Sequence, residues 1–277
     1  MSNQDPVIEF IDNAILEIKL FIKDSIYNLL TLVSFITFIA TISATPTTSM
    51  YPTIKKGDWF ILLKCMYGFN FHSFDMGPFG INHNYFWKNI FTYIIQKKFL
   101  QFRKFTPGDV ISFRADSDLT TGFLKRIIAV EGQTVQLIEG VVHIDGKPLP
   151  RKFLRSKIAI EKNSKYRFLY YEETSSSGKK YITRYIKNME YHSHNNTLKI
   201  KVPKGFIFAM GDNRDKSDDS RQSIGLVPVT NISGKGFLIF FSKSSKLSLF
   251  TLDLMTMFKS IIELPFKIKW KRIFTFL

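Results

Sequence analysis

The chain has 277 residues, and its 39 Lys and Arg against 23 Asp and Glu give a formal net charge of +16. Its length suits one main domain with appendages, and the single cysteine, Cys65, excludes an intramolecular disulfide. The basic excess comes without a nucleic-acid-binding motif and with Phe-rich stretches that carry Lys and Arg. An anionic lipid surface is therefore favoured over nucleic acid as a partner.

The N-terminal region predicts two helical segments. In residues 7–23 apolar residues recur at helical spacing and polar ones take the other face, which indicates an amphipathic helix within residues 1–24. Residues 26–44 contain no charged residue, and this length gives about 28 Å of helix, so a transmembrane anchor is predicted over residues 25–44. A cleavable secretory signal fits less well, because the region before it is long and acidic. Lysines on both sides leave the orientation open.

Beyond residue 44 the pattern becomes that of strands separated by turns. Asp145 and Gly146 between two short apolar runs indicate a hairpin. The sequence therefore predicts a mainly β fold, with one antiparallel β domain formed by residues 45–149 and 203–243. The predicted strands are 59–63, 110–113, 123–130, 134–138, 141–144, 206–210 and 236–241.

Three segments do not fit this β domain. Residues 69–106 are aromatic and basic, and we expect them to dip into lipid. Residues 150–202 are polar and charged, and they predict an inserted lobe with its own strands. The tail, residues 244–277, mixes apolar and basic residues, which predicts a basic amphipathic helix lying on a surface rather than a second membrane span.

Ser49 and Lys125 are the candidate catalytic pair. Ser49 follows the apolar segment within residues 46–53, and Lys125 lies in an apolar strand. A serine hydroxyl needs a base, and no histidine lies in a recognisable nucleophile pattern. A lysine can serve if its pKa falls by about two to three units, which takes roughly 3–4 kcal/mol and can come from burial. Strand alternation puts Lys125 on one face with Phe123 and Arg126 on the other; the plainer alternative is a lysine that reaches out to solvent.

A polar loop at residues 211–221 alternates acidic and basic side chains. It does not match a calcium-binding loop, because Arg214 falls on a ligand position and the closing glutamate is missing. A solvated turn remains open as an interpretation, since Asp, Asn and Ser favour turns. We favour a structural brace that orients a catalytic amine by hydrogen bonding.

Several short motifs occur in an order that is typical of one enzyme family. They are Ser49-Met50-x-Pro52-Thr53, Gly57-Asp58, Pro107-Gly108-Asp109-Val110, Lys125-Arg126, and Gly211-Asp212-Asn213-Arg214-Asp215 through Gly225-Leu226-Val227-Pro228. Together with the N-terminal segment, they resemble the bacterial type I signal peptidases, also called leader peptidases. The resemblance covers roughly residues 25–150 and 203–242, and it departs from the family pattern at 130–133 and 222–224.

The resemblance implies roles for the matching residues. Ser49 would attack the scissile carbonyl, and Lys125 would act as general base and then as the acid for the leaving amine. The Ser49 backbone N–H and the Thr47 hydroxyl would hold the oxyanion. Ser217 would bond to the Lys125 amine and orient it, and Met50 would shape the floor of a substrate pocket.

The sequence shows no metal site or nucleotide motif, so no cofactor is expected. The resemblance also implies two supporting ion pairs. Asp212 would pair with Arg126, and Asp219 with Arg221. The implied fold is an antiparallel β-sheet catalytic domain of the signal-peptidase type with an inserted β lobe, preceded by an N-terminal transmembrane helix.

The implied function is that of a membrane-anchored serine endopeptidase that removes signal peptides from exported preproteins, cutting after a small-x-small motif. The peptide would bind as an added strand beside the backbone that precedes Ser49 and Lys125. The implied location is the plasma (inner) membrane, with a single span and the catalytic domain on the outer, extracytoplasmic face. Exported preproteins, membrane lipid and the secretion machinery are the expected partners, and nucleic acid is not.

Two other functions remain open on the residues alone. A self-cleaving regulator shares the Ser/Lys chemistry, but it would carry a helix-turn-helix in place of a membrane segment. A non-enzymatic, basic, membrane-anchored β scaffold would have no need of Ser49, so Ser49→Ala would be silent in a processing assay.

Overall fold

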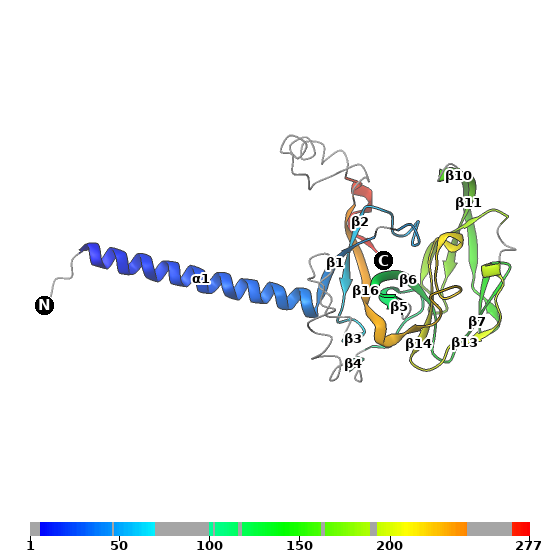
Figure 1. The fold of residues 1–277 in the computed structure, drawn as a ribbon. Coiled ribbons are helices and arrows are strands. Elements are labelled where there is room, and N and C mark those ends of the chain that lie inside the picture. The colour runs from blue at the N-terminus through cyan, green and yellow to red at the C-terminus, as the bar shows by residue number, and fades with distance from the viewer. Residues whose placement is uncertain are drawn as a thin grey trace.

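The computed structural model describes residues 6–45, 47–69, 100–101, 103–115, 118–161, 164–188, 193–242 and 268–277. One long helix leads into a β body whose strands come from the described residues between Ala40 and Phe276 (Figure 1). The strands of the main sheet are β1 (Ala40–Ala44), β2 (Asp58–Leu63), β5 (Val110–Ala115), β6 (Asp118–Val130), β14 (Phe206–Met210), β15 (Val227–Pro228), β16 (Ile232–Ser242) and β17 (Thr275–Phe276).

The main sheet is antiparallel. Its strands follow the order β1-β2-β16-β5-β6-β14-β15, and β17 pairs with β16. In β2 every second residue is buried, which is the pattern of a strand with one face on a core. The prediction of a mainly antiparallel β fold is confirmed.

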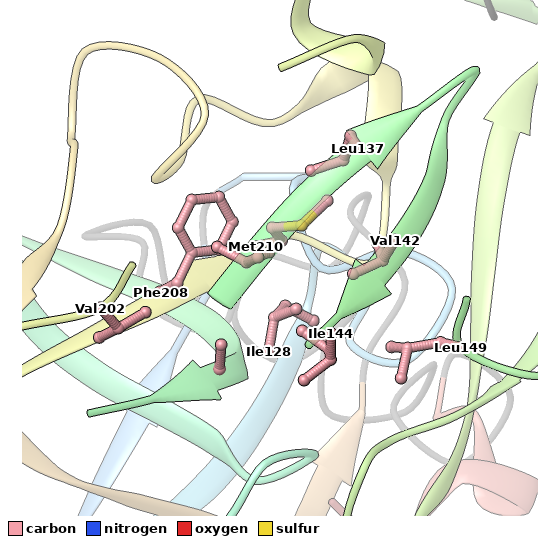
Figure 2. Packing of buried hydrophobic residues seen from close by; sticks show 10 residues of the cluster. Ile128, Leu137, Val142, Ile144, Leu149, Val202, Phe208 and Met210 are labelled. Atoms are coloured by element: carbon pink, nitrogen blue, oxygen red, sulfur yellow. The ribbon is translucent and has the colours of Figure 1, made fainter. Parts of the chain in front are cut away.

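A smaller sheet packs against the end of the main sheet that carries β6 and β14. It has the order β13-β7-β8-β9, formed by β13 (Ile200–Lys201), β7 (Thr134–Ile138), β8 (Val141–Ile144) and β9 (Lys147–Pro148). Leu137 and Val142 of this sheet meet Phe208 and Met210 of β14 in a shared hydrophobic core (Figure 2). Each fully buried side chain of this kind contributes about 1.5–3 kcal/mol. This core therefore fixes β14, and the polar loop at residues 211–221 begins directly after that strand.

The inserted segment forms a separate three-stranded sheet of order β10-β11-β12. Its strands are β10 (Arg151–Glu161), β11 (Ser164–Thr174) and β12 (Lys180–Ile186), and a turn at residues 175–178 joins the last two. The lobe was expected to run to residue 202, but Ile200–Lys201 pairs with β7 of the neighbouring sheet. Short 3-10 helices occur at Ser193–Asn195, Arg214–Lys216 and Val229–Asn231.

The N-terminal helix α1 (Pro6–Phe38) is continuous and projects away from the β body (Figure 1). An amphipathic helix and a separate membrane anchor were expected to meet at residues 24 and 25, but the helix runs through these residues without a break. It ends at Phe38, before the expected end at residue 44. Ala40–Ala44 instead forms strand β1 and pairs with β2, because Thr41 and Ile42 are β-branched and the pairing satisfies their backbone groups. In the described part of the chain no helix combines the length and the apolar character that crossing a membrane requires.

The C-terminal residues return to the main sheet. A helix was expected over residues 244–277, but the described part, residues 268–277, contains a 3-10 turn (Trp270–Arg272) and strand β17. Arg272 forms an ion pair with Asp58, and its Nη2 donates to the Thr53 carbonyl at 2.8 Å. These two contacts attach the C-terminal residues to the β body. Residues 243–267 lie outside the described residues.

The aromatic segment expected to contact lipid lies almost wholly outside the described residues. Its described ends include a two-stranded ribbon formed by β3 (Gly68–Phe69) and β4 (Leu100–Gln101). The prediction of lipid contact for residues 69–106 therefore stays a prediction.

Replacing Arg272 by Gln is expected to destabilise the fold. Asp58 is fully buried, so loss of its cationic partner leaves a charge in the interior and costs about 3 kcal/mol. Lys180→Gln is the matched control, because Lys180 and Glu172 form an exposed pair at 3.6 Å. Urea unfolding should show a lower midpoint for Arg272→Gln alone. Equal midpoints for the two variants would contradict this role of Arg272.

Candidate active site

Ser49 lies half-buried in the loop between β1 and β2. Its hydroxyl oxygen is 3.3 Å from the Thr47 hydroxyl oxygen. The next residue, Met50, is 1% exposed and packs with Ile54 and Phe60 in the core beneath the loop. Met50 thus anchors the Ser49 loop to this core. Its expected place on the floor of a substrate pocket stays a prediction.

Lys125 is buried in the middle of β6. It pairs with Ile111 of β5, and only 3% of its surface is exposed. Burial disfavours the ammonium and lowers the pKa of Lys125 to about 8, although the nearby carboxylates of Asp219 and Asp218 act in the opposite direction. The lysine can therefore exchange a proton near neutral pH.

The Lys125 amine has no hydrogen bond or ion pair to any described residue, and its nearest ring is Phe123, with the centroid 5.9 Å from Nζ. Ser217, which was expected to orient this amine, is buried, and its hydroxyl donates to the Asp218 carbonyl at 3.4 Å. The structure thus does not join Ser49, Lys125 and Ser217 by hydrogen bonds. Catalytic hydrogen bonds are often long in free enzymes and tighten when substrate binds.

Gly211 is the point at which the loops of Ser49 and Ser217 meet. A Cβ atom at Gly211 would lie 2.6 Å from the Ser49 carbonyl oxygen and would overlap the Ser217 side chain. In the sheet Met210 pairs with Arg126, so continuing the register by one residue places Gly211 beside Lys125. The absence of a side chain at Gly211 therefore lets these segments approach one another.

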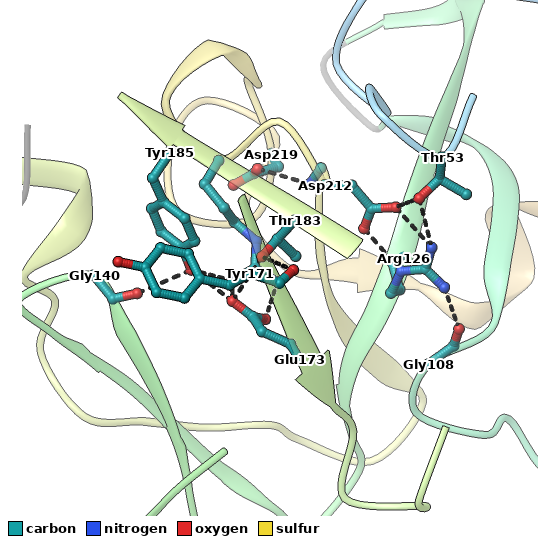
Figure 3. A network of polar contacts seen from close by, with 12 residues as sticks. Thr53, Gly108, Arg126, Gly140, Tyr171, Glu173, Thr183, Tyr185, Asp212 and Asp219 are labelled. Carbon is teal, nitrogen blue, oxygen red and sulfur yellow. Dashed lines mark hydrogen bonds and ion pairs between the residues drawn. The ribbon is translucent and has the colours of Figure 1, made fainter. Parts of the chain in front are cut away.

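Arg126 and Asp212 form a buried ion pair (Figure 3). Arg126 Nε donates to Asp212 Oδ1 at 2.8 Å, and Arg126 Nη2 donates to Oδ2 at 2.6 Å. Burial acts to lower the pKa of Arg126, but Asp212 outweighs it and raises that pKa. Arg126 Nη1 also donates to the Gly108 carbonyl at 2.6 Å, and the Thr53 hydroxyl donates to Asp212 at 2.5 Å. The structure thus brings together the first predicted supporting pair.

Asp219 and Arg221 form the second buried pair. Arg221 Nε and Nη2 donate to the two carboxylate oxygens of Asp219 at 2.8 and 2.9 Å. Burial acts to raise the pKa of Asp219, but Arg221 and the backbone N–H of Gly211 hold it below its usual value. The Gly211 N–H lies 3.0 Å from Asp219 Oδ2, so this pair also fixes the backbone beside Lys125.

Two contacts from the inserted lobe were missed in the sequence. Arg214 is buried and donates to both carboxylate oxygens of Glu173 at 3.0 and 2.6 Å and to the Tyr185 hydroxyl at 2.7 Å. Arg184 Nε donates to Asn213 Oδ1 at 2.9 Å. The alternation of charges in the polar loop singles out Arg214 in the sequence. No local sequence pattern, however, predicts which distant strand residue a loop residue will contact. In the described residues no three His, Cys, Asp or Glu side chains gather as metal ligands would.

Comparison with known proteins identifies the family. The family model described as signal peptidase, peptidase S26, matches residues 18–241. A signal peptidase I of Rickettsia typhi is 34% identical over 207 residues, which cover 71% of this chain and 70% of the relative. The chain belongs to the signal peptidase family, peptidase S26. A second relative, signal peptidase I of Rickettsia conorii, is 33% identical over 204 residues with the same coverage.

Family membership makes this chain a serine endopeptidase that removes signal peptides. A crystal structure of a signal peptidase I from Enterococcus faecalis covers 48% of this chain and 97% of its own chain, at 25% identity and a TM-score of 0.28. A TM-score this low does not establish a shared arrangement of strands, so the fold described above rests on this chain's own pairings.

Gly211→Ala is expected to impair processing. The new methyl group would meet the Ser49 carbonyl and the Ser217 side chain, and a displacement of about 1 Å at a catalytic group can cost roughly 100-fold in rate. Gly122→Ala is the matched control, because a Cβ at Gly122 meets nothing within 4 Å. Turnover of a model preprotein by the purified variants measures the effect. Unchanged turnover by Gly211→Ala would refute the close approach at this position.

Proposed function

We propose that Ser49 is the nucleophile of this signal peptidase and that Lys125 is its general base. The observation that carries the proposal is the burial of Lys125, which lowers its pKa to about 8. With that pKa roughly a tenth of the amine is neutral at pH 7, against less than a thousandth for an ordinary lysine. The contact of the Ser49 loop with Gly211 supports a position of the hydroxyl near this amine.

In the proposed reaction, Ser49 Oγ attacks the scissile carbonyl carbon while Lys125 Nζ takes the hydroxyl proton. The carbonyl oxygen becomes an oxyanion, which the Ser49 backbone N–H and the Thr47 hydroxyl stabilise by hydrogen bonds. The Lys125 ammonium then gives its proton to the leaving amine as the peptide bond breaks, which leaves an acyl ester on Ser49. Neutral Lys125 then takes a proton from a water molecule that attacks the acyl carbon, and the resulting ammonium returns that proton to Ser49 Oγ as the ester bond breaks, which restores the free serine.

The remaining site residues would support this reaction. Ser217 would orient the Lys125 amine once substrate has closed the site. The ion pairs Arg126–Asp212 and Arg221–Asp219 would hold the backbone on either side of Gly211. Met50 would carry the loop of Ser49 and contribute to the wall of a shallow pocket.

The proposed substrate is the extended segment of an exported preprotein that follows its signal helix. This segment would pair as an added strand with the backbone before Ser49 and before Lys125. Shallow pockets would admit small side chains and exclude larger ones, which gives cleavage after a small-x-small motif.

We propose that α1 holds the enzyme at the plasma membrane by a single anchor, with the β body on the outer face. Many large apolar side chains of α1 are exposed, among them Phe10, Leu16, Phe21, Leu29 and Phe35, and exposed apolar surface of this extent is typical of a membrane or partner contact. Anchoring here would keep Ser49, which follows the last helical residue Phe38 by eleven residues, near the lipid where preproteins emerge. Membrane lipid and the secretion machinery are then the expected neighbours.

Replacement of either member of the pair is expected to abolish processing. Ser49→Ala removes the nucleophile, and Lys125→Arg replaces the base by a guanidinium that stays protonated, so each should lower turnover by several orders of magnitude. Lys201→Ala, at an exposed lysine of β13, is the control and should retain activity. The assay is purified full-length protein with a model preprotein. An active Lys125→Arg enzyme would refute the assignment of the base, and an active Ser49→Ala enzyme would refute the assignment of the nucleophile.

The activity is expected to depend on pH through Lys125. Because only the neutral amine accepts the Ser49 proton, kcat/KM should rise tenfold per pH unit in acid and level off above about pH 8. An ordinary lysine would give a midpoint near 10.4. The measurement is kcat/KM for the model preprotein from pH 6 to 10. A flat profile, or a midpoint above pH 10, would contradict a buried lysine base.

A further inference from the structure

Asn213 holds both carbonyl groups beside Ser49. Its backbone N–H donates to the Ser49 carbonyl at 2.9 Å, and its side-chain Nδ2 donates to the Thr48 carbonyl at 2.9 Å. The Thr48 carbonyl and the Ser49 N–H belong to the same planar trans peptide, in which the two groups point in opposite directions. A hydrogen bond that fixes the Thr48 carbonyl therefore also fixes the direction of the Ser49 N–H.

Arg184 of β12 orients the Asn213 side chain. Arg184 Nε donates to Asn213 Oδ1 at 2.9 Å, so the carboxamide oxygen is engaged and its NH₂ group is directed at Thr48. The backbone N–H of Arg184 also donates to the Asp212 carbonyl at 2.9 Å. A strand of the inserted lobe is thus hydrogen-bonded to the loop that touches Ser49.

Arg184 is itself held in place on several sides. Its guanidinium lies 4.1 Å from the ring centroid of Tyr51 and 4.0 Å from that of Phe168, and the residue is 3% exposed. Arg184 Nη2 is 3.1 Å from Glu161, a residue at the end of β10. Partial burial acts to raise the pKa of Glu161, but Lys216 and Arg184 hold it below its usual value. The arginine therefore keeps an ionised partner as well as two aromatic walls.

We propose that Asn213 and Arg184 are positioning residues that aim the Ser49 N–H at the oxyanion. This inference rests on the proposed role of Ser49. It gives the inserted lobe a part in catalysis, because Arg184 acts on the nucleophile loop through Asn213 without touching substrate. The hydrogen bond to the Thr48 carbonyl also polarises the peptide and strengthens its N–H as a donor.

The size of the effect follows from the function of an oxyanion donor. Complete loss of one such donor costs about 100- to 1000-fold in kcat, so a misdirected donor should cost about 10- to 100-fold. Because the ground-state carbonyl is bound more weakly than the oxyanion, the loss should fall on kcat and leave KM within about twofold.

The experiment is a double-mutant cycle on the full-length protein with a model preprotein. The variants are Asn213→Ala, Arg184→Gln and the two combined, and each is expected to lower kcat with little change in KM. If Arg184 acts through Asn213, the combined variant should be no slower than Asn213→Ala alone. Arg167→Gln is the matched control, an exposed arginine on the neighbouring strand β11, and should behave as wild type.

Two further variants keep the test decisive if a truncation impairs folding. Asn213→Asp keeps the size and the acceptor for Arg184 but loses the donor to Thr48, so it should fold and still lose kcat. Arg184→Lys keeps the positive charge but loses the Nε donor and the flat stacking group, so it should not restore kcat.

The outcomes separate this inference from the proposed nucleophile. Wild-type kcat in Asn213→Asp or Arg184→Gln, beside an inactive Ser49→Ala enzyme, would overturn the positioning role and leave the role of Ser49 intact. Losses that add up in the combined variant, or that fall on KM alone, would also overturn it. An active Ser49→Ala enzyme would instead remove the proposed function on which the inference rests.

Discussion

The buried ion pair between Arg126 and Asp212 connects the two parts of the molecule on which the site depends. Arg126 belongs to β6, directly after Lys125, and Asp212 belongs to the loop that follows β14. The same loop contacts the carbonyls on both sides of Ser49 through its next residue, Asn213. This ion pair, which is shielded from water, therefore links the strand of Lys125 to the loop that contacts Ser49. Removing either Arg126 or Asp212 would leave the other as a buried charge without compensation.

The lysine itself makes the folded protein less stable. Its pKa lies near 8 in the fold against 10.5 ordinarily, which corresponds to a cost of about 3 kcal/mol at any pH below 8. This cost falls away as the pH rises from 8 to 10.5, because the folded protein has then released the proton that the unfolded chain still binds, and it is gone once the unfolded chain releases it too. The hydrophobic clusters around β5, β6 and β14 offset it, so the core packing is what allows this buried amine, which has no ion-pair partner among the described residues, to remain inside. A reduction in stability of this kind is common for groups with the role proposed for Lys125.

Local patterns predicted those parts of the fold that depend on neighbours in the chain. Short apolar runs next to turn residues located β2, β5, β7 and β8, and the motifs around Ser49 and Lys125 pointed to the chemistry. The prediction that the N-terminal helix extends to residue 44 was wrong. The uncharged run at residues 26–44 suits a helix, but Ala40–Ala44 pairs with β2 as a strand instead. The contacts of Arg184 and Glu173 with the polar loop join residues far apart in sequence, and no periodicity encodes such a pairing.

The proposed chemistry requires that burial lets the Lys125 amine lose its proton near neutral pH. An NMR titration of the Lys125 side chain in the folded full-length protein, with its Cε resonance assigned by its disappearance in Lys125→Arg, measures this directly. The expected midpoint lies near pH 8. A midpoint above pH 10, in a protein that is folded and active, would contradict it.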